Sequence, residues 1–269
     1  MEEIIKKANL ANKKSEQEYK SAELIFLKEI GLDKHIASKL SVSVRNLSEC
    51  LRDDRFDAEY WQPEYDAMEK AVSKVIQKEL GEIVSVLKGV EVGSEAYDPE
   101  GKPFIRVSDF SIYGIEDVEK KISPELYEEL KDKYTPKKGD VLFTKDGTIG
   151  LSYALHEEKV GILSGAFLRL KPTIKINTDY LALVLNSLYC KTQIERMSGG
   201  AIIAHLKPDS AKKIKIPLLS DAKQAEIAEK VSTAFRMRKE VKELLEKAKR
   251  AVEIFVERDE KEALSYLIS

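Results

Sequence analysis

The segment from Gly139 to Gly150 carries side chains that suit contact with a nucleic acid. It reads Gly-Asp-Val-Leu-Phe-Thr-Lys-Asp-Gly-Thr-Ile-Gly, which predicts a strand at 141–144 followed by a turn at 145–148. The Asp-Gly pair favours a tight turn with positive φ. Lys145 and Thr148 would then stand on a short loop, where an ammonium and a hydroxyl can donate to phosphates or base edges. On residue types alone, an ordinary hairpin turn explains the segment equally well.

Two further loops combine small residues with hydrogen-bond donors. One is Arg106-Val-Ser-Asp109, and the other runs from Ser198-Gly-Gly to His205 and Lys207. Lysines gather before the 141–144 strand and again near residue 210, where they could contact phosphates. A run of charge is more commonly a solvated face, and glutamates dilute the first cluster. The lysines are Lys131, Lys133, Lys137 and Lys138, then Lys207, Lys212, Lys213 and Lys215.

We find no catalytic constellation in the sequence. Asp209 with Asp221 and Lys223 loosely resembles a metal-dependent nuclease pattern, but Asp221 fits better as the first-turn acid of a helix. Neither GxGxxG nor GxxxxGK[ST] occurs, and the Asn/Asp-Pro-Pro-Tyr/Phe tetrapeptide of amino-methylating DNA enzymes is absent. The three histidines lie far apart without metal-ligand spacing. The chain is therefore predicted to be no enzyme, with no metal and no cofactor.

Composition limits the class of protein further. The chain has 269 residues, 34% of them charged, and a formal net charge of −2, so any nucleic-acid binding must use local clusters. Cys50 and Cys190 form no CxxC pair, which argues against a disulfide framework and a zinc ribbon. No apolar run approaches about 18 residues and no signal-peptide core is present. We expect a cytoplasmic protein without membrane contact.

The helices and strands that must position these loops can be predicted from the sequence, and their order indicates an α+β fold. A helix is expected at 1–30 with Gly31 as its C-cap, then a short strand near Val42–Leu47 and a helix at 64–80. Strands are predicted at 83–87, 104–107, 141–144, 151–155 and 162–170, and a helix at 179–197. This predicts a helical arm at 1–45, a globular recognition domain at 46–218, and a long helix at 219–269.

The long helix carries an apolar seam that repeats at intervals of four and three residues. That is the spacing of a coiled coil, over a helix about 50 Å long. Two interpretations stay open: packing along the chain's own domain, or a spacer that packs against a partner helix, which we favour. The helices at the two ends could also lie side by side as an antiparallel pair. The seam is Ile227, Val231, Ala234, Arg238, Val241, Leu245, Ala248, Val252 and Phe255.

Taken together, these segments resemble the specificity (S) subunits of type I restriction–modification systems. Phe104-Ile-Arg-Val-Ser-Asp resembles the family's (W/Y)IRVSD strand, and the segment at 139–150 resembles GDVLFSRSGTIG. Ser198-Gly-Gly with Leu206 is similar to a later GS…L element, and the segment at 216–227 follows IPLPPLxEQxxI. Arg55-Phe-Asp-Ala-Glu-Tyr-Trp resembles the start of a target-recognition domain. Leu219, Ser220 and Lys223 depart from the family pattern.

The resemblance implies recognition of double-stranded DNA without chemistry. S subunits carry two recognition domains held apart by antiparallel helices, and this chain has room for one, so it resembles half a subunit. It implies a homodimer reading a split target, with methyltransferase (M) subunits and a restriction (R) subunit supplying methylation and cleavage. The expected DNA-binding residues are Lys88, Arg106, Ser108, Thr144, Lys145, Thr148, Ser198, Gly199, His205 and Lys207.

Two other functions stay open at this point. One is a self-sufficient DNA-modifying or DNA-cleaving enzyme with an atypical site, which activity of the chain alone with Mg²⁺ or S-adenosylmethionine would reveal. The other is a helical scaffold that binds protein, which absence of a salt-dependent DNA shift would favour.

Overall fold

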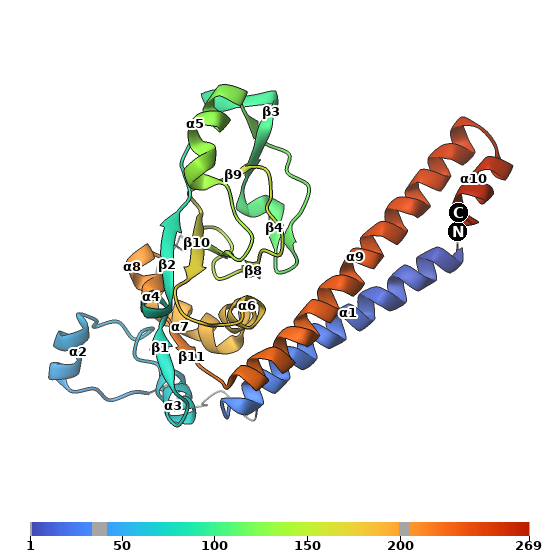
Figure 1. Cartoon of the computed structure of the whole chain (residues 1–269). Coiled ribbons are helices and arrows are strands. Elements are labelled where there is room, and N and C mark those ends of the chain that lie inside the picture. Colours follow the sequence, from blue (N-terminus) through green and yellow to red (C-terminus); the bar gives the residue numbers. More distant parts are fainter. Residues whose placement is uncertain (1, 34–41, 199–204, 269) are drawn as a thin grey trace. The chain divides into compact units, whose positions relative to one another are not determined.

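The computed structural model describes residues 2–33, 42–198 and 205–268. They form two compact units, which we call the helical unit (residues 1–22 and 226–269) and the mixed unit (residues 23–225) (Figure 1). The division lies inside two long helices, whereas the sequence suggested boundaries after residues 45 and 218. Among the described residues, no helix is both long enough and apolar enough to cross a membrane.

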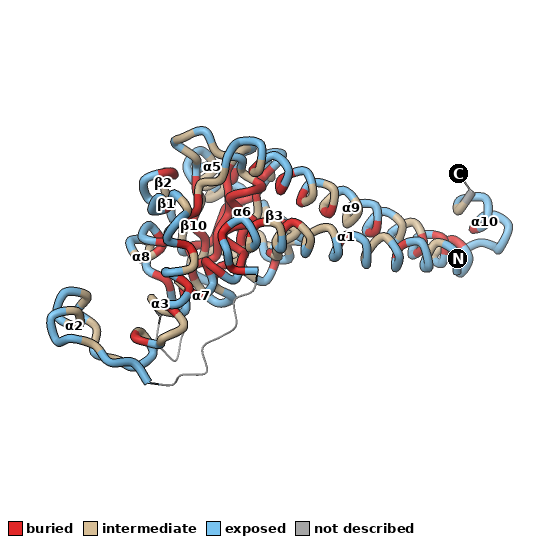
Figure 2. Tube along the Cα trace, turned by 90° about the horizontal axis from the view of Figure 1, so that it is seen from below, coloured by how far each residue is buried: buried red, intermediate tan, exposed pale blue. Residues whose placement is uncertain are grey.

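The helical unit is built on an antiparallel pair of helices, as the sequence predicted. Helix α1 (Glu2–Glu29) lies against α9 (Asp221–Glu257), and α10 (Glu260–Ile268) follows. Ala8, Ser15 and Ala22 recur every seven residues along α1 and are all buried, so the two backbones approach closely. Figure 2 shows buried positions recurring along both helices.

The seam of α9 packs on α1 of the same chain, so the expectation that this edge is free for a partner helix is wrong for much of its length. Five seam residues are buried: Ile227, Val231, Ala234, Val241 and Ala248. The guanidinium of Arg238 donates to the side-chain oxygen of Asn12 on α1, so this polar seam position is paired.

Beyond Val241 the buried stripe drifts away from the predicted one. Ala251 and Ile254 are buried, whereas Leu245, Val252 and Phe255 are about half exposed, at 47%, 50% and 55%. An α-helix has 3.6 residues per turn, so a strict 3.5-residue repeat turns gradually away from a straight partner. The pairs Ser15–Ala234 and Lys7–Glu240 also place the start of α1 before Val252 and Phe255, so these two residues lie past the part of α9 that faces α1.

The mixed unit is α+β. Its main sheet is antiparallel with strand order β2-β10-β7-β8, formed by β2 (Val84–Lys88), β10 (Phe167–Pro172), β7 (Val141–Thr144) and β8 (Ser152–Ala154). Helix α6 (Thr178–Asn186) packs on β7 and β8. The Asn177 side chain caps α6, and the Asn186 amide exchanges two hydrogen bonds with the Ser152 backbone, at 2.8 and 2.7 Å.

A second, three-stranded sheet has the order β6-β3-β9. Strand β3 (Tyr97–Ile105) pairs antiparallel with β6 (Lys121–Ile122) and parallel with β9 (Ile162–Leu163), and α5 (Pro124–Tyr134) contacts β3 and β9. Two small pairs complete the strands: β1 (Gln77–Glu79) with β11 (Lys215–Pro217), and β4 (Phe110–Ser111) with β5 (Gly114–Ile115). The remaining helices are α2 (Leu47–Asp53), α3 (Pro63–Val72), α4 (Leu80–Ile83), α7 (Leu188–Ser198), α8 (Pro208–Lys212) and the short η1 (Ser94–Ala96) and η2 (Val107–Asp109).

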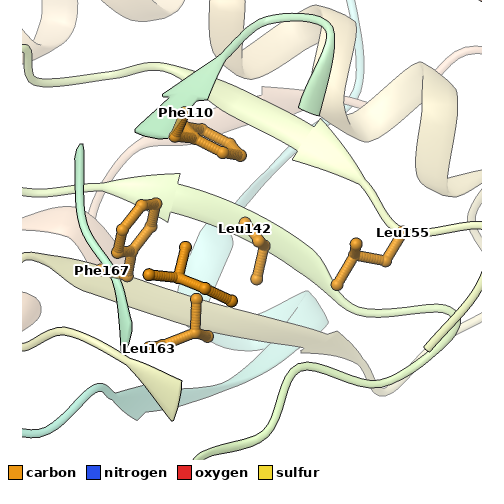
Figure 3. Packing of buried hydrophobic residues seen from close by; sticks show 6 residues of the cluster. Phe110, Leu142, Leu155, Leu163 and Phe167 are labelled. Carbon is orange, nitrogen blue, oxygen red and sulfur yellow. The ribbon is translucent and has the colours of Figure 1, made fainter. Parts of the chain in front are cut away.

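An apolar cluster joins the two sheets. Phe110 and Phe167 meet edge to face with ring centroids 5.1 Å apart, and four aliphatic side chains complete the cluster (Figure 3). These are Ile105, Leu142, Leu155 and Leu163, none more than 2% exposed. Residues of this cluster come from β3, β7, β9 and β10. The cluster therefore fixes the ends of the strands from which the candidate loops begin.

Several predicted elements differ in detail. The stretch 162–170 is two strands, β9 and β10, separated by Ser164-Gly-Ala, and the helix at 179–197 is two helices that break at Ser187. The helix predicted at 64–80 ends at Val72. No strand forms near Val42–Leu47, where Leu47 begins α2. Gly31 does follow α1 with φ +79°, as its predicted role requires.

Candidate nucleic-acid interface

Three loops meet at the backbone of residues 163–167, between β9 and β10, which we call the junction. Val90 N donates to Leu163 O (3.0 Å), Ser164 N to Ile105 O (2.9 Å), and Lys145 N to Ala166 O (2.8 Å). The loops that follow β2, β3 and β7 are therefore fastened to one short segment.

Glycine is required where the first loop crosses the junction. A Cβ on Gly89 would lie 2.1 Å from the carbonyl oxygen of Ser164, which no real side chain tolerates. Gly89 N also donates to Phe167 O at 3.0 Å. The small residues Ser164-Gly-Ala thus serve close backbone packing.

The loop at 144–150 is held by its own hydrogen bonds. The Thr144 hydroxyl donates to Thr148 O (2.5 Å) and accepts from Leu151 N (2.9 Å), and Gly150 N donates to Thr144 O (2.9 Å). Gly147 has φ +68°, consistent with the tight turn predicted from Asp-Gly. Thr144 is fully buried, so its hydroxyl shapes the loop and does not stand at the surface.

Lys145 is also buried, at 2% exposure, although its residue type suggested a surface contact. Its ammonium pairs with the carboxylate of Asp146, and the other oxygen of that carboxylate pairs with Nδ1 of His205. Asp146 and His205 also form an antiparallel backbone bridge. Lys145 and His205 were among the predicted site residues, but Asp146 was not. Its place between them depends on a contact with a residue 59 positions away in the chain, which no local pattern indicates.

The segment at 106–109 lies beside this loop. A Cβ on Gly147 would be 3.8 Å from Val107 Cγ1. The buried carboxylate of Asp109 accepts from Arg106 N and from the Ser108 hydroxyl, both at 2.9 Å, and lies 3.5 Å from the Arg106 guanidinium. Asp109 therefore holds Arg106 and Ser108 in a fixed turn next to the 144–150 loop.

The predicted DNA-binding residues divide by exposure. Lys88, Ser108, Thr148, His205 and Lys207 are exposed, Arg106 is partly exposed, and Thr144 and Lys145 are buried. Gly199 and the side chain of Ser198 lie outside the described residues. DNA contact by each of these residues stays a prediction.

A second polar cluster surrounds Arg196 on α7. Its guanidinium lies over the rings of Tyr60, Trp61 and Tyr65, 4.4 to 5.7 Å from their centroids, and donates to Tyr60 O at 3.1 Å. These residues line a cavity of about 590 Å³. The rings of Tyr60, Trp61 and Tyr65 thus already contact an arginine of the same chain.

Two ion-paired side chains in the mixed unit have shifted pKa values. Burial raises the pKa of Asp140 even though Arg169 Nε lies 3.1 Å from its carboxylate. The carboxylate of Asp179, 3.0 Å from His156 Nε2, raises the pKa of that imidazole. Among the described residues, no three His, Cys, Asp or Glu side chains gather as metal ligands would.

Comparison with known proteins places the chain in a family. The model for the type I restriction modification DNA specificity domain matches residues 73–249, well over half of the chain. The chain therefore belongs to this family of DNA sequence-specificity domains. The matched region covers all three junction loops and much of α9. No curated protein matches the sequence.

Solved structures of type I systems also match. The S subunit from M. genitalium has 17% identity and a TM-score of 0.49, over 98% of this chain and 57% of that one. The HsdS subunit from Thermoanaerobacter tengcongensis has 16% identity and a TM-score of 0.44, over 90% and 48%. A structure describing complex assembly and conformational transition of the type I R-M system has 15% identity and a TM-score of 0.46, over 91% and 53%. The chain spans about half the length of these proteins.

Proposed function

We propose that this chain gives a type I restriction–modification complex its DNA sequence specificity by reading one half of a two-part target. The family match over residues 73–249 carries this proposal, because it includes the junction and the loops fastened to it. The recognition is without chemistry: this chain selects the site, and adenine methylation and ATP-dependent cleavage belong to partner M and R subunits.

The exposed polar side chains near the junction would make the DNA contacts. Thr148 offers a hydroxyl and His205 an imidazole to base edges, and Lys88 and Lys207 suit phosphates. The Ser108 hydroxyl already donates to Asp109, so it would accept from the DNA. Contacts to phosphate release counterions, so binding should weaken steeply with salt. The net charge of −2 makes these local lysines the main source of attraction to DNA.

The helical unit would hold the partner chains. Leu245, Val252 and Phe255 leave apolar surface exposed on α9, near and past the end of its contact with α1. Val252 lies seven residues after Leu245, and Val256 lies four residues after Val252, so these three residues share one face of the helix. We propose that this face packs against helices of M subunits or of a second copy of this chain, and that two copies supply the two recognition domains of a split target.

Selection from a randomised DNA duplex library tests the function directly. The full chain, alone and co-purified with a candidate M subunit, should enrich one short sequence, and methylated adenines mapped with the pair should fall at that sequence. Failure to enrich any sequence in both forms would contradict the proposal. Cleavage or methylation by the chain alone would point instead to a self-sufficient enzyme.

A further inference from the structure

Asp146 lies between two cationic or potentially cationic groups of very different exposure. One carboxylate oxygen pairs with the ammonium of Lys145, which is 2% exposed, and the other with Nδ1 of His205, whose side chain is 49% exposed. Asp146 itself is intermediate, at 29%. The three side chains therefore run from the interior to the surface in the order Lys145, Asp146, His205.

Backbone contacts hold the same three residues in register. Lys145 N donates to Ala166 O at 2.8 Å, and Leu206 N donates to Lys145 O at 2.9 Å. Asp146 and His205 face each other in an antiparallel bridge. These backbone contacts keep Asp146 opposite His205 for as long as the loop at 144–150 holds its neighbours.

The burial of Lys145 decides which member of this group can meet DNA. A buried ammonium needs its counter-charge, since breaking such a pair leaves an uncompensated charge in the interior. The Lys145 ammonium therefore stays paired with Asp146 and is not available to DNA. His205 is the exposed member, and because Nδ1 is engaged by Asp146, Nε2 is the ring nitrogen left for a ligand.

We propose that Asp146 is a positioning residue that orients His205 to read a base edge in the major groove, with Lys145 as its buried counter-ion. This inference rests on the proposed function and names the specificity-determining side chain within it. An imidazole held through Nδ1 can accept from the amino group of adenine or cytosine when neutral, and can donate to N7 or O6 of guanine when protonated. Lys145 does not itself read the sequence.

The experiment compares variants of the full chain in selection from a randomised duplex library. His205→Gln should lower the preference at one base pair about tenfold and leave the other positions of the selected sequence unchanged. Lys145→Met fills the same buried space without charge and should keep the preference. The double variant Lys145→Met/Asp146→Asn removes the pair without leaving a buried charge, and should lose preference at the same base pair as His205→Gln.

The chain offers a matched control. His156 is also 49% exposed and also pairs with an aspartate, Asp179 at 3.0 Å, but it lies outside the loop at 144–150 and its bridge to His205. His156→Gln should keep the full preference. Far-ultraviolet circular dichroism checks that every variant is folded before its selected sequences are compared.

The outcomes distinguish failure of the proposed function from failure of the assigned role of Asp146 and His205. A wild-type chain that enriches no sequence contradicts the proposed function. A wild-type chain that enriches one, together with unchanged preference in His205→Gln or in the double variant, overturns only the present inference. Loss of preference in Lys145→Met, or equal weakening on all sequences in His205→Gln, would also overturn it, since the first assigns the reading to Lys145 and the second makes His205 a phosphate contact.

Discussion

The hydroxyl of Ser15 on α1 donates to the backbone carbonyl of Ala234 on α9 at 2.8 Å, and both residues are buried. The small size of both residues is what allows the two backbones of the helical unit to come so close. Because Ala234 O is within a helix, it keeps a backbone partner if the hydroxyl is removed. Size should therefore matter more than hydrogen bonding at this position.

We predict that Ser15→Ala costs about 0.5–1.5 kcal/mol of unfolding free energy, the usual net worth of one hydrogen bond. Ser15→Leu should cost more than Ser15→Ala. It also loses the hydrogen bond, and its added carbons force the helices apart, which by itself costs about 1–3 kcal/mol of unfolding free energy. Chemical denaturation followed by circular dichroism measures both. Equal stability of the leucine variant and the wild type would contradict close packing at this point.

Gly89 tests whether the junction positions the recognition loops. Gly89→Ala places a methyl group against the Ser164 carbonyl and should weaken binding to the selected DNA sequence by about 1–3 kcal/mol. Gly139→Ala is the control: its φ of +87° makes alanine strained, by about 1–2 kcal/mol, but nothing lies within 4 Å of the added Cβ. Both variants should lose stability, and only the first should lose specific binding. Similar binding losses in both would assign the effect to instability.

The pair His156–Asp179 gives the stability of the mixed unit a pH dependence. Because Asp179 raises the pKa of His156 in the folded chain, the pair's contribution is fully present below the ordinary histidine pKa of about 6.5 and is lost as pH rises through the higher folded pKa. The imidazole is half exposed, so the effect should not exceed about 1 kcal/mol.

His156→Gln should therefore be less stable than wild type at pH 5.5 and nearly equal to it at pH 9. Denaturation curves at the two pH values measure the difference. A stability difference that is the same at both would show that protonation of His156 contributes nothing.

Lys207 should act as a phosphate contact if the proposed function holds. Lys207→Ala is expected to weaken binding evenly across DNA sequences and to reduce the slope of log affinity against log salt by about 1. Lys175→Ala is the control and should leave the slope unchanged. Lys175 lies away from the junction, and its ammonium is 2.5 Å from the carboxylate of Asp221. Titrations of the selected DNA with each variant at several salt concentrations measure this slope. A sequence-dependent loss in Lys207→Ala would instead make it a base contact.

The sequence predicted those features that depend on local pattern. The heptad spacing from Ile227 to Val241 located the helix contact, and Asp-Gly located the turn at Gly147. Features that depend on tertiary contacts did not follow from it. The burial of Lys145 requires Asp146, and the break in the stretch 162–170 becomes clear only when the loops meeting Ser164-Gly-Ala are known. The expectation of a free edge was wrong for the part of α9 from Ile227 to Val241, because a sequence pattern does not say which helix covers a seam.

The exposed apolar face of α9 yields a prediction about assembly. Val252 and Val256 on this face are 50% and 76% exposed, so replacing both with Glu should change the unfolding free energy of the chain little, by about 0.5 kcal/mol per site. If this face packs against a second copy, the double variant should shift a concentration-dependent dimer toward monomer in light scattering. Val231→Glu is the contrasting variant: Val231 is 1% exposed within the helix pair, so a buried carboxylate there should disrupt folding of the helical unit.

A wild-type chain that stays monomeric at micromolar concentration, with and without DNA, would contradict the homodimer and leave M-subunit helices as the partner of this face. In that case the double variant should lose co-purification with the M subunit while keeping its DNA binding, because the recognition loops lie on the mixed unit.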